Sequence, residues 1–206
     1  DLLHDTPEDE LYEQSLARAR EVMLKGTGAI EIKSGYGLTL EDELKMLRVI
    51  RCIRRTVPMT VRATFLGAHA VGRAFAGRRQ DYVDHVCREM IPAVAAEGLA
   101  DFVDVFCDRG FFTPAQTAQI MEAAAPYGMR PKIHANELDV SGGVEVGVEH
   151  GAVSVDHLER AEQPQIDLLA KSATIATMLP GASFFLGMPY APARKALEAG
   201  CRVALA

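Results

Sequence analysis

The sequence predicts an α/β protein whose fold is a (β/α)8 barrel of the TIM type. Short apolar runs rich in β-branched and aromatic residues alternate with helical segments, at a spacing of roughly 20 to 40 residues. Several runs are apolar at consecutive positions, which is typical of strands buried on both faces of a parallel sheet. Seven such runs are too many for an ordinary two-layer sheet of this length. We therefore expect about seven of the eight strands of a barrel, with a doubly wound sheet as the alternative.

The helices are predicted from the residues that begin and end them. Thr39 caps a segment with one apolar face, and Pro58 ends it. Thr113 and Gln116 form a capping box at the start of another helix, which Gly128 ends. A third helix runs from a cap at Thr6 to about residue 26. Further helices are expected near residues 80–97, 143–149, 164–171 and 192–199.

The strands are predicted from the apolar runs between these helices. They cover residues 29–32, 61–66, 102–106, 132–135, 153–155, 174–179 and 201–205. Residues 172–193 carry no charge over 22 positions, but prolines and glycines interrupt them. A membrane-spanning helix would leave backbone groups unpaired at these breaks, so we expect a buried strand followed by an apolar loop.

The composition indicates an ordinary soluble chain. It has 22 Lys and Arg against 28 Asp and Glu, and 49% of its residues are hydrophobic. With no basic stripe, nucleic acid is excluded as an expected partner, and a membrane is excluded as well. The N-terminus has no signal-peptide pattern, so we expect a cytoplasmic protein.

Three of the six histidines stand where predicted strands end. His69, His134 and His157 each close a different run, and Glu137 follows His134 closely. A single histidine in an apolar strand is more typical of a satisfied core residue than of a ligand. Three that converge at one barrel mouth favour a metal site instead, with Glu137 as a nearby proton carrier.

Two further features are less specific. Tyr36 lies between glycines after the first run and is either an exposed loop residue or a phenol that binds substrate. The apolar residues 180–186 either line a substrate mouth or simply pack, and packing is the expected role.

Six motifs, in order along nearly the whole chain, resemble the imidazolonepropionase family of the amidohydrolase superfamily. The Lys-Ser-Gly-Tyr-Gly-Leu block at 33–38 and the Phe-Leu-Gly-Ala-His-Ala block at 65–70 are specific to that family. The other matching segments are 103–107, 132–137, 155–158 and 179–182.

The resemblance implies a cytoplasmic enzyme of histidine degradation that hydrolyses 4-imidazolone-5-propanoate to N-formimino-L-glutamate. It implies a barrel with a small β-sandwich domain, usually as a homodimer, and one divalent metal ion, zinc or iron. His134 would be a metal ligand, Tyr36 and His69 would bind the substrate, and Glu137 would also contact it. Glu137 and His157 would handle protons, with His157 as the essential group.

The departures from the family pattern are also informative. The family's His-x-His pair, its later aspartate ligand and its carboxylate-binding arginine match nothing in residues 1–206. We therefore expect residues 1–206 to be a partial catalytic barrel without the β-sandwich, inactive by itself. The alternatives are another amidohydrolase of cyclic amides, or a non-catalytic barrel that serves as a binding partner.

Overall fold

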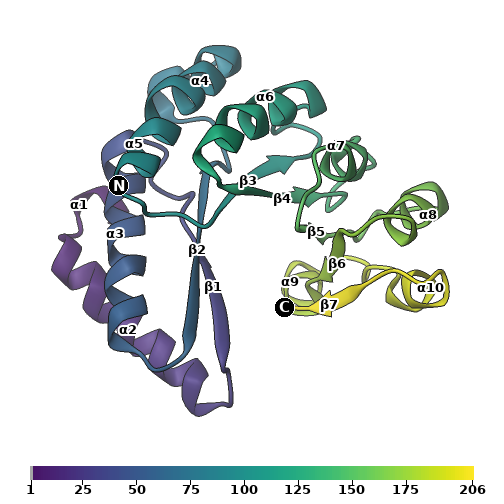
Figure 1. Ribbon diagram of the computed structural model, residues 1–206, viewed down its shortest axis with the longest axis horizontal. Helices are drawn as coiled ribbons and strands as arrows, with labels where there is room; N and C mark the ends of the chain where they lie inside the picture. The colour runs from purple at the N-terminus through teal and green to yellow at the C-terminus, as the bar shows by residue number, and fades with distance from the viewer. Residues whose placement is uncertain (1) are drawn as a thin grey trace. The chain divides into compact units, whose positions relative to one another are not determined.

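The computed structural model describes residues 2–206 as parallel strands that alternate with helices (Figure 1). The seven strands follow one another in the sheet in chain order, β1 to β7. The chain divides into two compact units. The first unit comprises 2–103 and Pro126–Met129, and the second comprises Asp104–Ala125 and Arg130–Ala206. Strand β3 (Phe102–Cys107) contributes residues to both units.

The first unit is built on two parallel strands. Strand β1 (Ala29–Lys33) pairs with β2 (Thr60–Ala68). Helix α3 (Leu40–Thr56) packs against β2, and α2 (Glu8–Leu24) packs against α3. The helix predicted from Thr39 is confirmed, because the Thr39 side chain accepts a hydrogen bond from the Asp42 amide.

The start of the chain differs from the prediction. A short helix, α1 (Leu2–Asp5), comes first, and α2 is preceded by Pro7 in the capping position rather than by Thr6. His4 is held in place by a hydrogen bond with Asp42, in which Nδ1 of His4 lies 2.9 Å from Oδ2 of Asp42. Thr6 instead donates its hydroxyl to the Leu2 carbonyl and so closes α1.

The helix expected near residues 80–97 is interrupted. Two α-helical segments, α4 (Arg79–His85) and α5 (Ile91–Ala96), flank a π-helical turn at Val86–Met90. Pro92 has no N–H to donate to the preceding turn, and its ring would collide with the carbonyl there. A wider turn before the proline relieves both problems.

Asp101 joins the segment before β3 to its neighbours in the first unit. Its carboxylate accepts from the Ala63 amide at 2.8 Å and from Arg62 at 3.0 Å, and it also pairs with Arg54. Burial raises the pKa of Asp101, but these donors outweigh burial and hold that pKa below its ordinary value. The charged form is therefore the one that stabilises the fold.

Acid should remove this contribution. We expect Asp101→Asn to lower the free energy of unfolding by about 1–2 kcal/mol at pH 7. Because the folded-state pKa is depressed, wild type should lose this advantage as the pH falls through that value. Urea unfolding of both proteins at pH 7 and pH 3 measures the difference in their free energies of unfolding. An equal difference at both pH values would contradict the stabilising role given to the charged Asp101.

The second unit continues the parallel pattern. Strands β4 (Arg130–Ala135), β5 (Ser154–His157), β6 (Ile175–Met178) and β7 (Val203–Leu205) pair in that order. Helices cover these strands and form a core with them, notably through Ile133, Val155 and Leu169. The helices are α6 (Pro114–Ala124), α7 (Gly143–Glu149), α8 (Gln163–Ala170) and α10 (Ala193–Glu198). The predicted capping box of Thr113 and Gln116 is confirmed.

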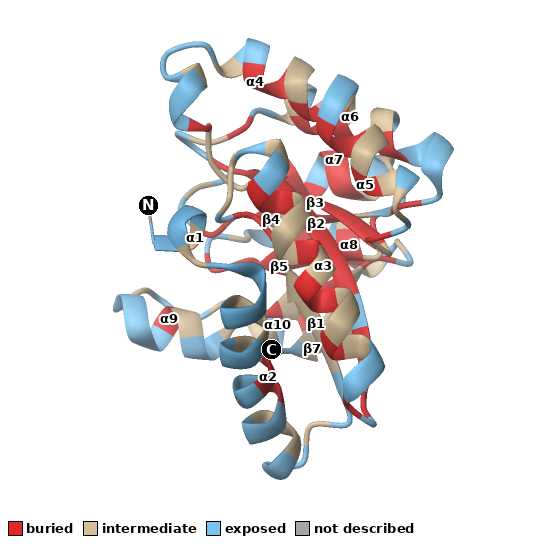
Figure 2. Ribbon diagram, turned by 90° about the vertical axis from the view of Figure 1, so that its left-hand side faces the viewer, coloured by how far each residue is buried: buried red, intermediate tan, exposed pale blue. Residues whose placement is uncertain are grey.

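One prediction in this unit is wrong. The residues expected to form an apolar loop form helix α9 (Pro180–Leu186), and they do not simply pack. Phe184 and Phe185 are 77% and 87% exposed, whereas Ser183 is buried. Proline at the first helical position suits a helix start, and Gly187 ends the helix at a φ of +66°. Figure 2 shows α9 and α2 as largely exposed, in contrast to the buried strands β2 and β3.

Within residues 2–206, no helix combines the length and the apolar character needed to cross a membrane.

Candidate active site

Two of the predicted histidines lie side by side at the ends of neighbouring strands in the second unit. His134 is the penultimate residue of β4, and His157 is the last residue of β5. The parallel register places His134 opposite Asp156 and Ala135 opposite His157. The two imidazole rings have centroids 5.3 Å apart. The local sequence therefore presents two nitrogen bases at one edge of the sheet.

His157 lies between two carboxylates. Its Nε2 is 3.5 Å from Oε2 of Glu137, and its Nδ1 is 3.4 Å from Oε2 of Glu159. Ser183, on α9, donates its hydroxyl to Oε1 of Glu159 at 2.8 Å. All four side chains are buried, so the order Ser183, Glu159, His157 and Glu137 forms a polar row shielded from solvent. Such a row can orient an imidazole and stabilise its protonated form.

The pKa shifts agree with this arrangement. Burial alone lowers the pKa of His157, but the close carboxylate of Glu159 and the charge of Glu137 raise it overall. Burial raises the pKa of Glu137, and although the nearby His157 lowers it, burial together with the charge of Glu159 keeps this pKa above its ordinary value. Burial also raises the pKa of Glu159, but the ion pair with His157 and the hydrogen bond from Ser183 outweigh burial and lower it overall. Glu159 thus favours the charged form, while Glu137 holds a proton more readily than an exposed glutamate does.

The backbone at this point adopts an uncommon conformation. His157 has a φ of +87° and Leu158 a φ of +71°, so two successive non-glycine residues are left-handed. Such residues each cost of order 1–3 kcal/mol, and they cluster at functional sites. The turn also lets the Leu158 amide donate to the Ala135 carbonyl at 3.1 Å. The imidazole of His157 is therefore held by backbone geometry as well as by its carboxylate neighbours.

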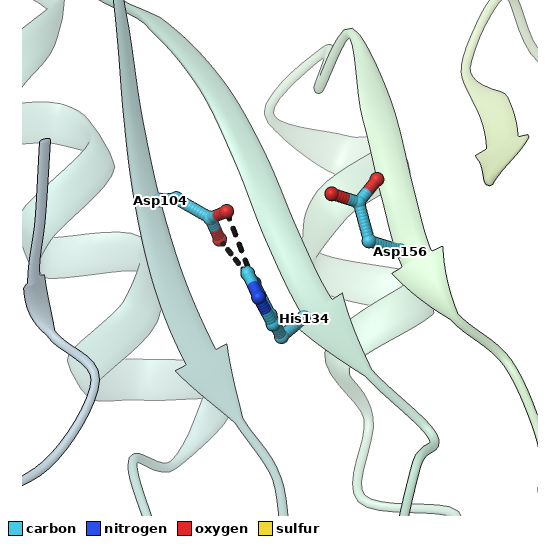
Figure 3. A group of neighbouring side chains, drawn as sticks. All are labelled: Asp104, His134 and Asp156. Carbon is cyan, nitrogen blue, oxygen red and sulfur yellow. Dashed lines mark hydrogen bonds and ion pairs between the residues drawn. The ribbon is translucent and has the colours of Figure 1, made fainter. Parts of the chain in front are cut away.

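A second group of acidic and imidazole side chains lies on the same strands. Figure 3 shows Asp104 from β3 and His134 from β4 pointing toward one another, with Asp156 projecting from β5. One ligand atom from each lies within 4.8 Å of the others. Nδ1 of His134 is 3.0 Å from Oδ1 of Asp104. A carboxylate on one ring nitrogen orients the imidazole and leaves Nε2 as the nitrogen for a metal.

Asp156 has its own partners. It accepts the Ser154 hydroxyl at 2.6 Å, and the ammonium of Lys132 lies 3.5 Å away. Imidazole and carboxylate donors together suit zinc and iron, so the residues present fit a divalent metal at this place.

A buried carboxylate shapes the loop that carries Glu137. Asp108 is 3% exposed, and it accepts from the amides of Glu137 and Leu138 at 2.9 Å each. It also accepts from the Asp139 amide at 3.1 Å and from the Ser141 hydroxyl at 2.6 Å. These bonds fix the backbone directly beneath the Glu137 side chain.

Removal of this charge should loosen the loop. In Asp108→Asn, one carboxylate oxygen is replaced by an amide NH2 group that faces N–H donors, so we expect a loss of about 2–3 kcal/mol in the free energy of unfolding. Faster hydrogen exchange at the amides of Glu137, Leu138 and Asp139 should accompany it. Denaturant unfolding with amide exchange tests this. Unchanged exchange at these three amides would contradict the role given to Asp108.

The other two predicted residues lie in the first unit. Tyr36 follows β1 and His69 directly follows β2, and their ring centroids are 5.2 Å apart. Because β1 and β2 are parallel, both residues lie at the carboxyl ends of their strands. Tyr36 is 70% exposed, so its phenol can meet a ligand.

The other three histidines have structural contacts of their own. His85 stacks on Phe75 at 5.1 Å between ring centroids. Nδ1 of His150 lies 3.0 Å from the Val146 carbonyl at the end of α7. His4 pairs with Asp42, as described above.

Sequence reasoning missed several buried polar residues of the second unit. The sequence could have revealed Asp104, because a charged residue between valines in an apolar strand needs a polar partner when it is buried. The sequence does not single out Asp108, Glu159 or Ser183. An acidic residue after a strand, or a serine in an apolar helix, is ordinary at a protein surface. The loop residues that bond to Asp108 lie 29 to 33 positions further along the chain, and Ser183 lies 24 positions after Glu159.

Comparison with known proteins gives close matches in sequence. The chain is 50% identical over 204 residues to the imidazolonepropionase of Christiangramia forsetii and 48% identical to that of Flavobacterium johnsoniae. Each alignment covers 99% of this chain and 50% of the relative. The chain thus spans about half the length of the curated relatives it matches. No family model matches the chain.

Solved structures share the fold at low sequence identity. A 5-methylcytosine deaminase from Klebsiella pneumoniae, liganded with 5-fluorocytosine, matches with a TM-score of 0.76 and 14% identity, over 99% of this chain and 53% of that one. An atrazine chlorohydrolase from Arthrobacter aurescens, complexed with zinc and atraton, matches with a TM-score of 0.71 and 16% identity, over 97% and 49%. These likenesses confirm the predicted barrel fold. In sequence, the chain is similar over nearly its whole length to imidazolonepropionases, and it aligns with about half of each of them.

Proposed function

We propose that the protein hydrolyses the cyclic amide of 4-imidazolone-5-propanoate to give N-formimino-L-glutamate, a step of histidine degradation. The observation that carries this proposal is the 50% identity to an imidazolonepropionase over 99% of the chain. The buried pairing of His157 with Glu137 and Glu159 supports it, because ring opening needs a group that moves protons.

The metal proposed is one divalent ion, zinc or iron, with His134 as its ligand. When bound, the metal would polarise the carbonyl of the ring and activate the attacking water. The fit of the donor set at Asp104, His134 and Asp156 supports a divalent ion, and one structural neighbour was solved with zinc. Asp104 would hold the His134 ring in the orientation that presents Nε2.

The chain's own residues would do the remaining work. We assign proton transfer to His157, which Glu159 orients from the other side of the ring. Glu137 would contact the substrate and assist His157. Tyr36 and His69 would bind the substrate, since the phenol is exposed and lies against the imidazole. The proposed assembly is a cytoplasmic homodimer, which cell fractionation and light scattering of the purified protein can test.

A substrate panel tests the function. The complete gene product, loaded separately with zinc and with iron, is given imidazolone propanoate, hydantoin and dihydroorotate, and products are identified by mass spectrometry. We expect N-formimino-L-glutamate from the first substrate only. Turnover of another ring in its place would support a different amidohydrolase. No turnover of any substrate by metal-loaded protein would support the non-catalytic alternative.

A further inference from the structure

Helix α3 contributes a buried carboxylate that the proposed reaction does not use. Glu43 lies in the first turn of α3 and has no exposed surface. A buried glutamate is rare unless several donors compensate it. Here the donors come from the loop of residues 34–38, which carries Tyr36 at its centre.

Backbone amides of the 34–38 loop donate hydrogen bonds to the carboxylate of Glu43. The Gly35 amide lies 3.0 Å from Oε2 and 3.2 Å from Oε1 of Glu43. The amides of Gly37 and Leu38 each donate to Oε1 at 2.9 Å. The Ser34 hydroxyl is a further hydrogen-bond partner of Glu43. Residues on both sides of Tyr36 are thus bonded to one side chain.

The loop conformation depends on close packing as well as on these bonds. Gly35 has a φ of +112°, and a Cβ there would lie 2.8 Å from the Leu66 carbonyl oxygen and 3.2 Å from Cβ of His69. A Cβ at Gly37 would lie 2.8 Å from the Glu43 amide. The loop therefore fills the space between the end of β2 and the start of α3, and only glycine fits at these two positions.

The loop also bonds to β2. Ser34 accepts from the Leu66 amide at 3.0 Å through its hydroxyl, and its own amide donates to the Thr64 carbonyl. Tyr36, by contrast, is mostly exposed, and its ring meets that of His69. The position of the phenol is consequently set by the backbone beneath it.

We propose that Glu43 is a positioning residue for substrate binding: its carboxylate gathers the amides of the 34–38 loop and thereby holds Tyr36 against His69. The proposal rests on the proposed function, in which Tyr36 and His69 bind the substrate. Substrate affinity then depends on a side chain that never touches the substrate.

The substitution that tests this is Glu43→Gln in the complete, metal-loaded gene product. Glutamine keeps the length but puts an NH2 group among N–H donors, so the loop must shift. We expect kcat/KM for imidazolone propanoate to fall by roughly 10- to 100-fold, mainly through KM, with metal content unchanged. Glu41→Gln, on the same helical turn but exposed, is the matched control and should behave as wild type.

A double-mutant comparison shows whether Glu43 acts through Tyr36. Tyr36→Phe removes the phenol hydroxyl, so Glu43→Gln in that background should lower kcat/KM by less than roughly threefold. An equal loss in both backgrounds would overturn the proposal. If Glu43→Gln does not fold, Ser34→Ala can take its place, because it removes one hydrogen bond of the same cluster. The same comparison with and without Tyr36→Phe applies, with a smaller expected loss of kcat/KM.

A readout without substrate separates this proposal from the proposed function. In protein with 13C-labelled tyrosine rings, Glu43→Gln should shift the Tyr36 ring resonance, and Glu41→Gln should not. The Gly35, Gly37 and Leu38 amides should exchange faster with solvent. If wild type turns over no imidazolone but these signals change, the proposed function fails while the loop mechanism stands. An unmoved Tyr36 resonance would overturn the role of Glu43 whatever the substrate.

Discussion

His157→Asn should lower kcat by roughly three to four orders of magnitude while the metal content stays at the wild-type level. Asparagine tolerates the left-handed backbone at this position, so the turn after β5 should keep its shape. The substitution removes the only group in the row from Ser183 to Glu137 whose ordinary pKa is near neutral. Under the proposed mechanism, the expected loss is therefore one of proton transfer rather than of folding.

Glu137→Gln provides the comparison. Glutamine keeps the length and the hydrogen-bonding reach of Glu137 but cannot accept a proton. We expect a smaller loss of kcat than in His157→Asn, with metal retained, because the proposed mechanism has Glu137 assist His157 and leaves proton transfer itself to His157. His150→Asn is the matched control, since the His150 ring lies at the end of α7, where it contacts the Val146 carbonyl and Glu122, and the kcat of this variant should stay normal. Near-normal turnover of His157→Asn would refute the assignment.

The second large effect is expected from His134→Ala. Loss of a metal ligand should lower the metal content of the dialysed protein, and activity should fall with it. Excess metal in the assay should restore part of the activity, because the other donors remain. Elemental analysis beside turnover measures both quantities.

Asp104→Asn refines this experiment. The variant keeps the His134 ligand but weakens the partner of its Nδ1, so metal affinity should fall by roughly 10- to 100-fold without being abolished. A full metal content in His134→Ala would exclude His134 as a ligand. Equal losses in both variants would instead make Asp104 a ligand in its own right.

Local signals in the sequence were sufficient for most of the fold. Thr39 and Thr113 form their caps as predicted, because a cap depends only on residues within one turn. The π-helical turn before Pro92 was missed, although proline itself was the signal. Helix α9 was missed because an apolar segment without charges has no polar face to reveal its period.

The candidate site was only partly accessible to the same reasoning. His134 and His157 could be singled out because histidine is rare at the ends of apolar strands. Glu43, Asp108 and Glu159 could not, because an acidic residue in a helix or loop normally faces water. What makes them important is the set of amides, hydroxyls and imidazoles that tertiary packing gathers around each carboxylate.

The left-handed turn at His157 and Leu158 also has a consequence for how this gene would evolve. The folded protein carries an energetic cost at that turn, and we expect selection for the proposed chemistry to maintain it. In a duplicated copy freed from that selection, residue 157 should drift early to glycine or asparagine, while core positions such as Ile133 persist. Histidine at this position in a present-day copy is thus a sign that the lineage still uses it, and sequencing of duplicated copies in related genomes can test that order of loss.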